Sequence, residues 1–333
     1  MEDIARILDF RPPAWLRNPH LQSVLPSLPL RHPAMARRAR TLLEASTPRV
    51  LECGDDARLL ALVATQEALG RDRPRRAVVL LHGWEGSADS LYLLSLGQAA
   101  LDAGFDVIRL NLRDHGPTHH LNRELFHSCR IAEVVAAVGR LQALHPGQEM
   151  SLAGFSLGGN FALRVGARAA AAGLRLRRIV AVCPVLDPAV TLDALERGPA
   201  LYREYFLLKW RRSLRRKQAA WPGEYDFADL IGERSLTGMT ARMVERYTDF
   251  PSLASYLRGY AITGEALATL ETQSRLITSM DDPMILPGEL RQLKRVPALD
   301  VTLTRFGGHC GFVDSLRGPT WIDREILAEL LRD

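Results

Sequence analysis

Lysine and cysteine are both scarce in this sequence, and its excess of positive charge is small. Three of the 43 basic residues are lysines, and the formal net charge of the 333-residue chain is +5. So small and dispersed an excess argues against nucleic-acid binding. The four cysteines, Cys53, Cys129, Cys183 and Cys310, are far apart and form no CxxC pair. We therefore expect free thiols in a reducing compartment.

Long apolar runs are absent as well. The first residues include Glu2 and Asp3 and contain no apolar core, which is not the pattern of a secretory signal. No apolar run is long enough to span a bilayer, so we expect a cytoplasmic protein. Apolar residues make up 47% of the chain and charged residues 24%, as in ordinary globular proteins. A chain of this length buries enough surface to need neither a disulfide nor a metal for its core.

The chain does contain an alternation of short apolar strands and helices. Residues 77–81 form a continuous apolar run of the kind that is buried on both faces of a sheet. Strands are predicted at 49–52, 59–64, 77–81, 105–112, 150–153, 178–183, 274–279 and 300–306, and helices at 87–103, 129–144, 157–172 and 322–331. This order predicts an α/β fold with a mainly parallel central sheet and helices on both faces.

Two segments depart from the alternation. Residues 11–33 are rich in proline and lack a period, and we expect them to be extended, within an N-terminal arm (residues 1–48) that packs on the body. Residues from about 186 to 268 look helical, carry several aromatics and lie between two predicted strands. They are predicted to form a cap inserted into one domain that covers residues 49–333.

The sharpest motif is Gly-Phe-Ser-Leu-Gly at 154–158, which fits G-x-S-x-G between a predicted strand and a predicted helix. In that context the pattern indicates the nucleophile elbow of an α/β-hydrolase fold, where the chain turns at one strained residue, Ser156. Glycines at both ends let neighbouring backbone approach, and the helix N-terminus favours an anion. The alternative, a glycine-rich turn with an incidental serine, is disfavoured by the strand–turn–helix context.

A serine hydroxyl needs a general base, and in this fold the chain order is nucleophile, acid, histidine. His309 lies in a glycine-rich loop just after the last predicted strand and is the expected base. The acid should follow the preceding strand, where Asp281 and Asp282 are adjacent. Both remain candidates, and the register from the strand end favours Asp282 as the group that orients His309.

The turn that follows the strand at 77–81 reads His-Gly-Trp-Glu-Gly. Backbone N–H groups in such a turn can face a carbonyl oxygen, so the amides of Trp84 and Leu157 are the predicted oxyanion hole. The histidine-rich stretch 113–120 invites a metal interpretation. It contains no HExxH or Cys/His pairing that would fix a tetrahedral site, so no metal is predicted.

Basic residues cluster at 209–217, inside the predicted cap. One interpretation is a solvated helix face, which we favour because such faces are common and this stretch has few apolar anchors. The other is a weak peripheral contact with an anionic membrane.

Together these motifs resemble those of the YheT-like α/β hydrolases, which are related to the eukaryotic ABHD lipases and esterases. The resemblance covers most of the chain. It rests on Asn-Pro-His-Leu-Gln at 18–22, the elbow at 154–160, Asp-Asp-Pro at 281–283, Gly-Gly-His-Cys-Gly-Phe at 307–312, and the cap segment 202–260 with Trp-Pro-Gly at 221–223. The loop 111–116 departs from the pattern of these relatives.

The resemblance implies hydrolysis of carboxylic esters, with short- to medium-chain acyl esters or lipid esters as substrates. It implies a triad of Ser156, Asp281 or Asp282, and His309, an acyl-enzyme, and no cofactor. The same residues would serve an acyltransferase or an amidase. A ligand-binding protein on a hydrolase scaffold is the alternative from another class, and the intact set of Ser, Asp and His argues against it.

Overall fold

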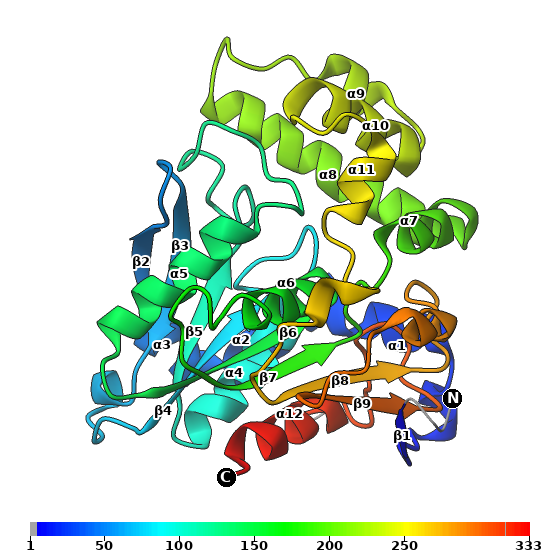
Figure 1. The fold of residues 1–333 in the computed structure, drawn as a ribbon. Coiled ribbons are helices and arrows are strands. Elements are labelled where there is room, and N and C mark those ends of the chain that lie inside the picture. The colour runs from blue at the N-terminus through cyan, green and yellow to red at the C-terminus, as the bar shows by residue number, and fades with distance from the viewer. Residues whose placement is uncertain (1–4, 317) are drawn as a thin grey trace.

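The computed structural model describes residues 5–316 and 318–333, which fold around a central sheet (Figure 1). In spatial order the strands are β1, β9, β8, β7, β6, β4, β5, β3 and β2. Neighbours are parallel except that β3 runs antiparallel to both β5 and β2. The strands are β1 (Arg6–Leu8), β2 (Ser46–Glu52), β3 (Arg58–Ala64), β4 (Arg76–Leu81), β5 (Asp106–Asn111), β6 (Glu149–Phe155), β7 (Leu176–Val182), β8 (Ser274–Ser279) and β9 (Leu299–Thr304). The predicted α/β fold class is confirmed.

Helices cover both faces of this sheet. They must do so because successive apolar side chains of β4 point to opposite faces and both sets are buried. Val79 and Leu81 belong to one core with residues of α5 and α6, whereas Val78 and Leu80 belong to another with residues of α4 and α12. The helices are α1 (Pro19–Val24), α2 (His32–Arg38), α3 (Arg40–Ala45), α4 (Leu91–Asp102), α5 (Ile131–Leu144), α6 (Leu157–Gly166), α7 (Pro188–Arg197), α8 (Ala200–Ala220), α9 (Ala228–Gly232), α10 (Leu236–Tyr247), α11 (Leu253–Arg258) and α12 (Trp321–Leu331).

Residues 11–33, which we expected to be extended, are partly helical, so that expectation is wrong. The side chain of Asn18 caps α1 by accepting from the backbone N–H groups of His20 and Leu21, at 2.9 and 3.1 Å. Pro19 stands at the first helical position, where a missing N–H removes no intrahelical bond. Proline therefore starts a helix here instead of preventing one. Upstream, β1 pairs with β9 as an edge strand.

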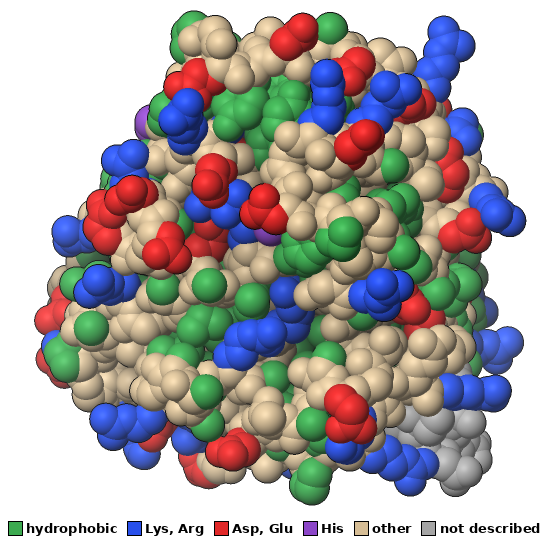
Figure 2. Space-filling model, turned by 45° about the horizontal axis from the view of Figure 1, so that its top comes forward, with side chains coloured by type: hydrophobic (Ala, Val, Ile, Leu, Met, Phe, Trp, Pro, Cys, Tyr) green, Lys and Arg blue, Asp and Glu red, His purple; other side chains and the backbone are tan. Residues whose placement is uncertain are grey.

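Helices α7 to α11 follow β7 in the chain and precede β8, and they form what we call the helical layer. In Figure 1, α8 to α11 stack above the sheet. Among the described residues, no helix combines the length and the apolar character needed to cross a membrane. Figure 2 shows acidic and basic side chains interspersed over one face of the molecule.

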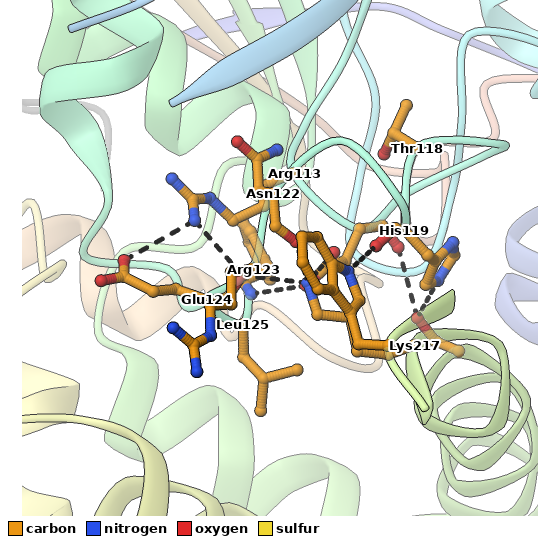
Figure 3. A network of polar contacts seen from close by, with 12 residues as sticks. Arg113, Thr118, His119, Asn122, Arg123, Glu124, Leu125 and Lys217 are labelled. Atoms are coloured by element: carbon orange, nitrogen blue, oxygen red, sulfur yellow. Dashed lines mark hydrogen bonds and ion pairs between the residues drawn. The ribbon is translucent and has the colours of Figure 1, made fainter. Parts of the chain in front are cut away.

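The helical layer is fastened to the body by a buried lysine of α8. The Nζ atom of Lys217 donates to Asp114 Oδ1 at 2.9 Å and to the backbone oxygens of Asn122 and Glu124 at 2.6 and 3.1 Å (Figure 3). These acceptors use all three donors of the ammonium. The Lys217 side chain is 1% exposed, and burial lowers its pKa although Asp114 opposes that shift. The β5–α5 loop and α8 are therefore joined by one buried ion pair.

We expect Lys217→Met to lower the free energy of unfolding by about 3–5 kcal/mol, because it leaves the buried Asp114 carboxylate without its counter-ion. Urea unfolding followed by far-UV circular dichroism measures the loss. Arg216→Met is the matched control, because Arg216 is exposed on the same helix and should change stability by less than about 0.5 kcal/mol. Equal losses in the two variants would show that the buried pair does not fasten α8.

Candidate active site

The turn from β6 into α6 places Ser156 at the carboxyl end of the sheet in a strained conformation. Its φ is 54°, which is unusual for a residue with a side chain. The flanking glycines are sterically required: a Cβ on Gly154 would lie 2.2 Å from Gly158 O, and one on Gly158 would lie 2.3 Å from Leu81 O. The G-x-S-x-G spacing therefore reflects close packing of the helix N-terminus against the ends of β6 and β4.

The structure brings Ser156, His309 and Asp282 into one hydrogen-bonded chain. Ser156 Oγ lies 2.9 Å from His309 Nε2, and His309 Nδ1 lies 2.9 Å from Asp282 Oδ2. The other carboxylate oxygen of Asp282 accepts from the backbone N–H groups of Met284 and Ile285, at 2.8 and 2.9 Å. A carboxylate only accepts, so His309 Nδ1 carries a proton and the neutral ring accepts from Ser156 at Nε2.

Asp281 points elsewhere, although it is the immediate neighbour of Asp282. Its Oδ1 accepts from the backbone N–H of Gly308 at 2.8 Å, so it holds the loop that carries His309 and not the imidazole. Burial raises the pKa of Asp281. Of the two carboxylates left open by the sequence, the structure places Asp282 against the histidine ring.

The turn at 82–86 lies directly against the elbow, since a Cβ on Gly83 would be 3.3 Å from Ser156 Cβ. Within the described part of the chain, the N–H groups of Trp84 and Leu157 donate to no protein acceptor. Two free backbone donors beside a serine can stabilise an oxyanion.

His82 belongs to the packing of this turn. Its Nε2 accepts from Leu112 N at 3.1 Å, so Nδ1 carries the proton and donates to Gly83 O at 2.8 Å. Burial lowers the pKa of His82 to about 3, so the ring stays neutral.

The charge state of His309 is set by two opposing effects. Burial lowers its pKa, but the charges and hydrogen bonds of Asp282 and Cys310 together outweigh burial, and the net pKa lies well above the ordinary value. The Asp282 side chain is fully buried, so little water screens this attraction. The arrangement can therefore hold the imidazolium that forms when His309 takes a proton from Ser156.

Residues of α1, which received no role from the sequence, also clamp the histidine loop. Ser23 Oγ accepts from His309 N at 2.8 Å. The buried Gln22 side chain donates to Leu16 O and Val313 O and accepts from Val313 N, at 2.8, 2.9 and 2.7 Å. The motif at 18–22 was a signal for these contacts, but its partners lie nearly 300 residues away in the chain.

Two cysteines also lie beside the histidine. Within the described residues, the Cys183 and Cys310 sulfurs and a His309 ring nitrogen form a group of metal-ligand type, with atoms within 4.8 Å of one another. Both His309 nitrogens already bind Ser156 and Asp282, so a metal here and the hydrogen-bonded chain exclude one another. The histidines at 115, 119 and 127 form no such group in the described chain.

Comparisons with known proteins show the family and the fold of the chain. A family model described as "alpha/beta hydrolase fold" matches residues 76–316. "Putative esterase YheT" of Escherichia coli K12 is 23% identical over 96% of this chain and 92% of its own length. "Phospholipase ABHD3" of Mus musculus is 21% identical over 75% of this chain and 62% of its own length. Among solved structures, the Pyrococcus furiosus esterase Pf2001 superposes with a TM-score of 0.54 at 15% identity, covering 83% of this chain and 88% of that one.

The clamp on the histidine loop predicts a stability effect at Gln22. We expect Gln22→Ala to lower the free energy of unfolding by at least about 2 kcal/mol, because each buried backbone group left unpaired costs about 1–3 kcal/mol. Thermal and urea unfolding measure the change. Gln142→Ala is the matched control, because that side chain binds both backbone groups of Arg175 at the exposed surface, where water replaces the lost bonds. Equal effects would contradict a buried clamp.

Proposed function

The chain belongs to the alpha/beta hydrolase fold family, and on that premise we propose that it is a serine hydrolase that cleaves carboxylic esters. The observation that carries the proposal is the chain of 2.9 Å contacts from Ser156 through His309 to Asp282. A nucleophile bonded to a base, and a base oriented by a buried acid, is the arrangement that activates a serine for acyl transfer. Two relatives carry esterase or phospholipase in their names, which supports ester over amide substrates.

In the proposed mechanism, Ser156 Oγ attacks the ester carbonyl carbon while His309 Nε2 takes the hydroxyl proton. The Trp84 and Leu157 amides donate to the oxyanion of the tetrahedral intermediate. His309 then gives its proton to the leaving alcohol, and an acyl-enzyme remains. Water adds to the acyl carbonyl with His309 again as base, and the carboxylic acid leaves as Ser156 regains its proton. Asp282 stays ionised and stabilises the imidazolium in both halves.

We propose that the helical layer acts as a cap, formed by an insertion at about 186–268 within the domain that covers residues 49–333. Support comes from the aromatic contact between α8 and the turn at 82–86: the Trp84 ring stacks on Phe206 at 5.0 Å and meets Trp210 edge-on at 5.2 Å. Apolar walls beside a serine suit an acyl chain. We therefore propose short- to medium-chain acyl esters or lipid esters as the substrate class.

Labelling with a fluorophosphonate probe tests the triad and the choice of acid. We expect the label on Ser156 in the wild type and none in Ser156→Ala. Turnover of a p-nitrophenyl ester should fall by about 10³–10⁴ in Asp282→Asn, because the histidine loses its orienting charge. Asp281→Asn keeps an acceptor oxygen for Gly308 N and should lose less than about tenfold. Losses in the reverse order would exchange the two roles, and a folded wild type without label or turnover would favour the ligand-binding alternative.

The raised pKa of His309 predicts the acid limb of the pH profile. Only the neutral ring can accept the Ser156 proton, so kcat/KM should rise with pH and reach half its plateau above pH ~6.5, the ordinary histidine value. In Asp282→Asn the carboxylate that raises the pKa is gone, so the midpoint of the residual activity should move to lower pH. A midpoint that does not move would show that Asp282 does not set the charge state of His309.

A further inference from the structure

One face of α8 exposes large apolar side chains to solvent. Leu201, Tyr205 and Leu208 are 60%, 40% and 65% exposed, and their spacing of four and three residues puts them on one stripe of the helix. Single exposed apolar residues need no explanation, but three along one stripe form a continuous apolar edge. Figure 2 shows hydrophobic and basic side chains next to one another on the side of the molecule that carries the helical layer.

The same stripe continues as a basic one. Arg212, Arg215 and Arg216 are exposed, and none forms an ion pair within the described part of the chain. The other basic residues of the 209–217 cluster serve the fold: Lys209 donates to Glu85 O and Arg211 to Glu233 O. The structure thus separates the cluster into side chains that hold α8 in place and three arginines that face outward.

The apolar edge also adjoins the proposed active site. The Tyr205 ring contacts Phe206 at 5.3 Å, and Phe206 stacks on Trp84. Trp84 follows Gly83, which packs against Ser156. Aromatic side chains therefore connect the solvent stripe of α8 to the turn at 82–86, and that turn packs against Ser156.

From these observations we propose that the α8 stripe docks the protein on anionic membrane surfaces. Leucine and tyrosine suit the boundary between head groups and acyl chains, and arginines on the same stripe attract anionic phospholipids. Glu204 of α8 is acidic, but its Oε1 lies 3.3 Å from Nε of Arg203, which offsets its charge. The docking proposal depends only on the exposed side chains and charges of α8, not on the proposed function. A further consequence does rest on the proposed function: an ester lying in the membrane would reach Ser156 past the aromatic side chains.

Vesicle co-sedimentation tests the docking, with the Ser156→Ala protein so that no lipid is hydrolysed. We expect binding to mixed phosphatidylglycerol–phosphatidylcholine vesicles and much weaker binding to pure phosphatidylcholine vesicles. Each arginine near an anionic surface contributes about fivefold to partitioning, so the triple Arg212→Gln, Arg215→Gln, Arg216→Gln variant should bind about a hundredfold more weakly. Added salt should weaken wild-type binding in the same direction.

A second triple variant separates location from net charge. Arg37→Gln, Arg49→Gln and Arg175→Gln remove the same charge from exposed positions outside the helical layer and should leave binding within about twofold. Leu201→Ser with Leu208→Ser should weaken binding to the anionic vesicles, because the apolar anchors are lost.

Three results would overturn the proposal: no binding to anionic vesicles, equal losses in the two arginine triples, or a dimer in analytical ultracentrifugation that the leucine variants dissociate. The last result would assign the stripe to a second copy of the chain. Fluorophosphonate labelling of the wild-type protein, purified in parallel, reports on Ser156 independently. Labelling of the wild type without vesicle binding by the Ser156→Ala protein refutes the docking alone, and vesicle binding without labelling of the wild type refutes only the hydrolase.

Discussion

The candidate site depends on one steric constraint, the close approach of the α6 N-terminus to the end of β4. Gly158 lies so near Leu81 O and His82 O that a side chain at this position is excluded. That contact lets β6 turn into α6 at a single residue, and it fixes Ser156 at a positive φ. The same contact brings the turn at 82–86 alongside the serine, so the candidate nucleophile and the candidate oxyanion donors are positioned by the same backbone packing.

The histidine loop is held in a comparable way, by contacts with its surroundings. Cys310 and Phe312 have positive φ values although they carry side chains, and such a backbone persists only where its surroundings determine it. Asp281 and Ser279 bind Gly308, while Gln22 and Ser23 bind Val313 and His309. The α1 segment is thus part of the structure that presents the imidazole to Ser156, although it lies at the opposite end of the chain.

How far the sequence could predict this structure depends on the range of the contacts involved. Strands β2 to β9, the elbow and the position of His309 follow from local periodicity, steric requirements and chain order, all of which can be read from short windows. Asp281 and Asp282 differ only in direction, which depends on the turn at Met284 and Ile285. Asn18 and Pro19 are a local signal for the start of a helix, but the high proline content of residues 11–33 favoured an extended segment instead. The partners of Gln22 and Lys217 lie far away in the chain, and no local pattern specifies them.

Helix α8 shows that the role of a charge cluster depends on which face of the helix each residue occupies, and not only on how many charges the segment contains. Counted along 209–217, its basic residues have few apolar anchors, and a solvated face is the natural interpretation. In the structure, Lys217 is buried on Asp114 and the neighbouring arginines face solvent. The anchors occur up to two turns earlier, at Leu201, Tyr205 and Leu208.

The 3.6-residue repeat of α8 gives each of its faces a separate task. One face carries Phe206 and Trp210 onto Trp84, and Lys217 reaches the β5–α5 loop. The outward face carries the apolar and basic stripe. One helix therefore joins the outward stripe, through its packing on Trp84, to the turn that lies beside Ser156.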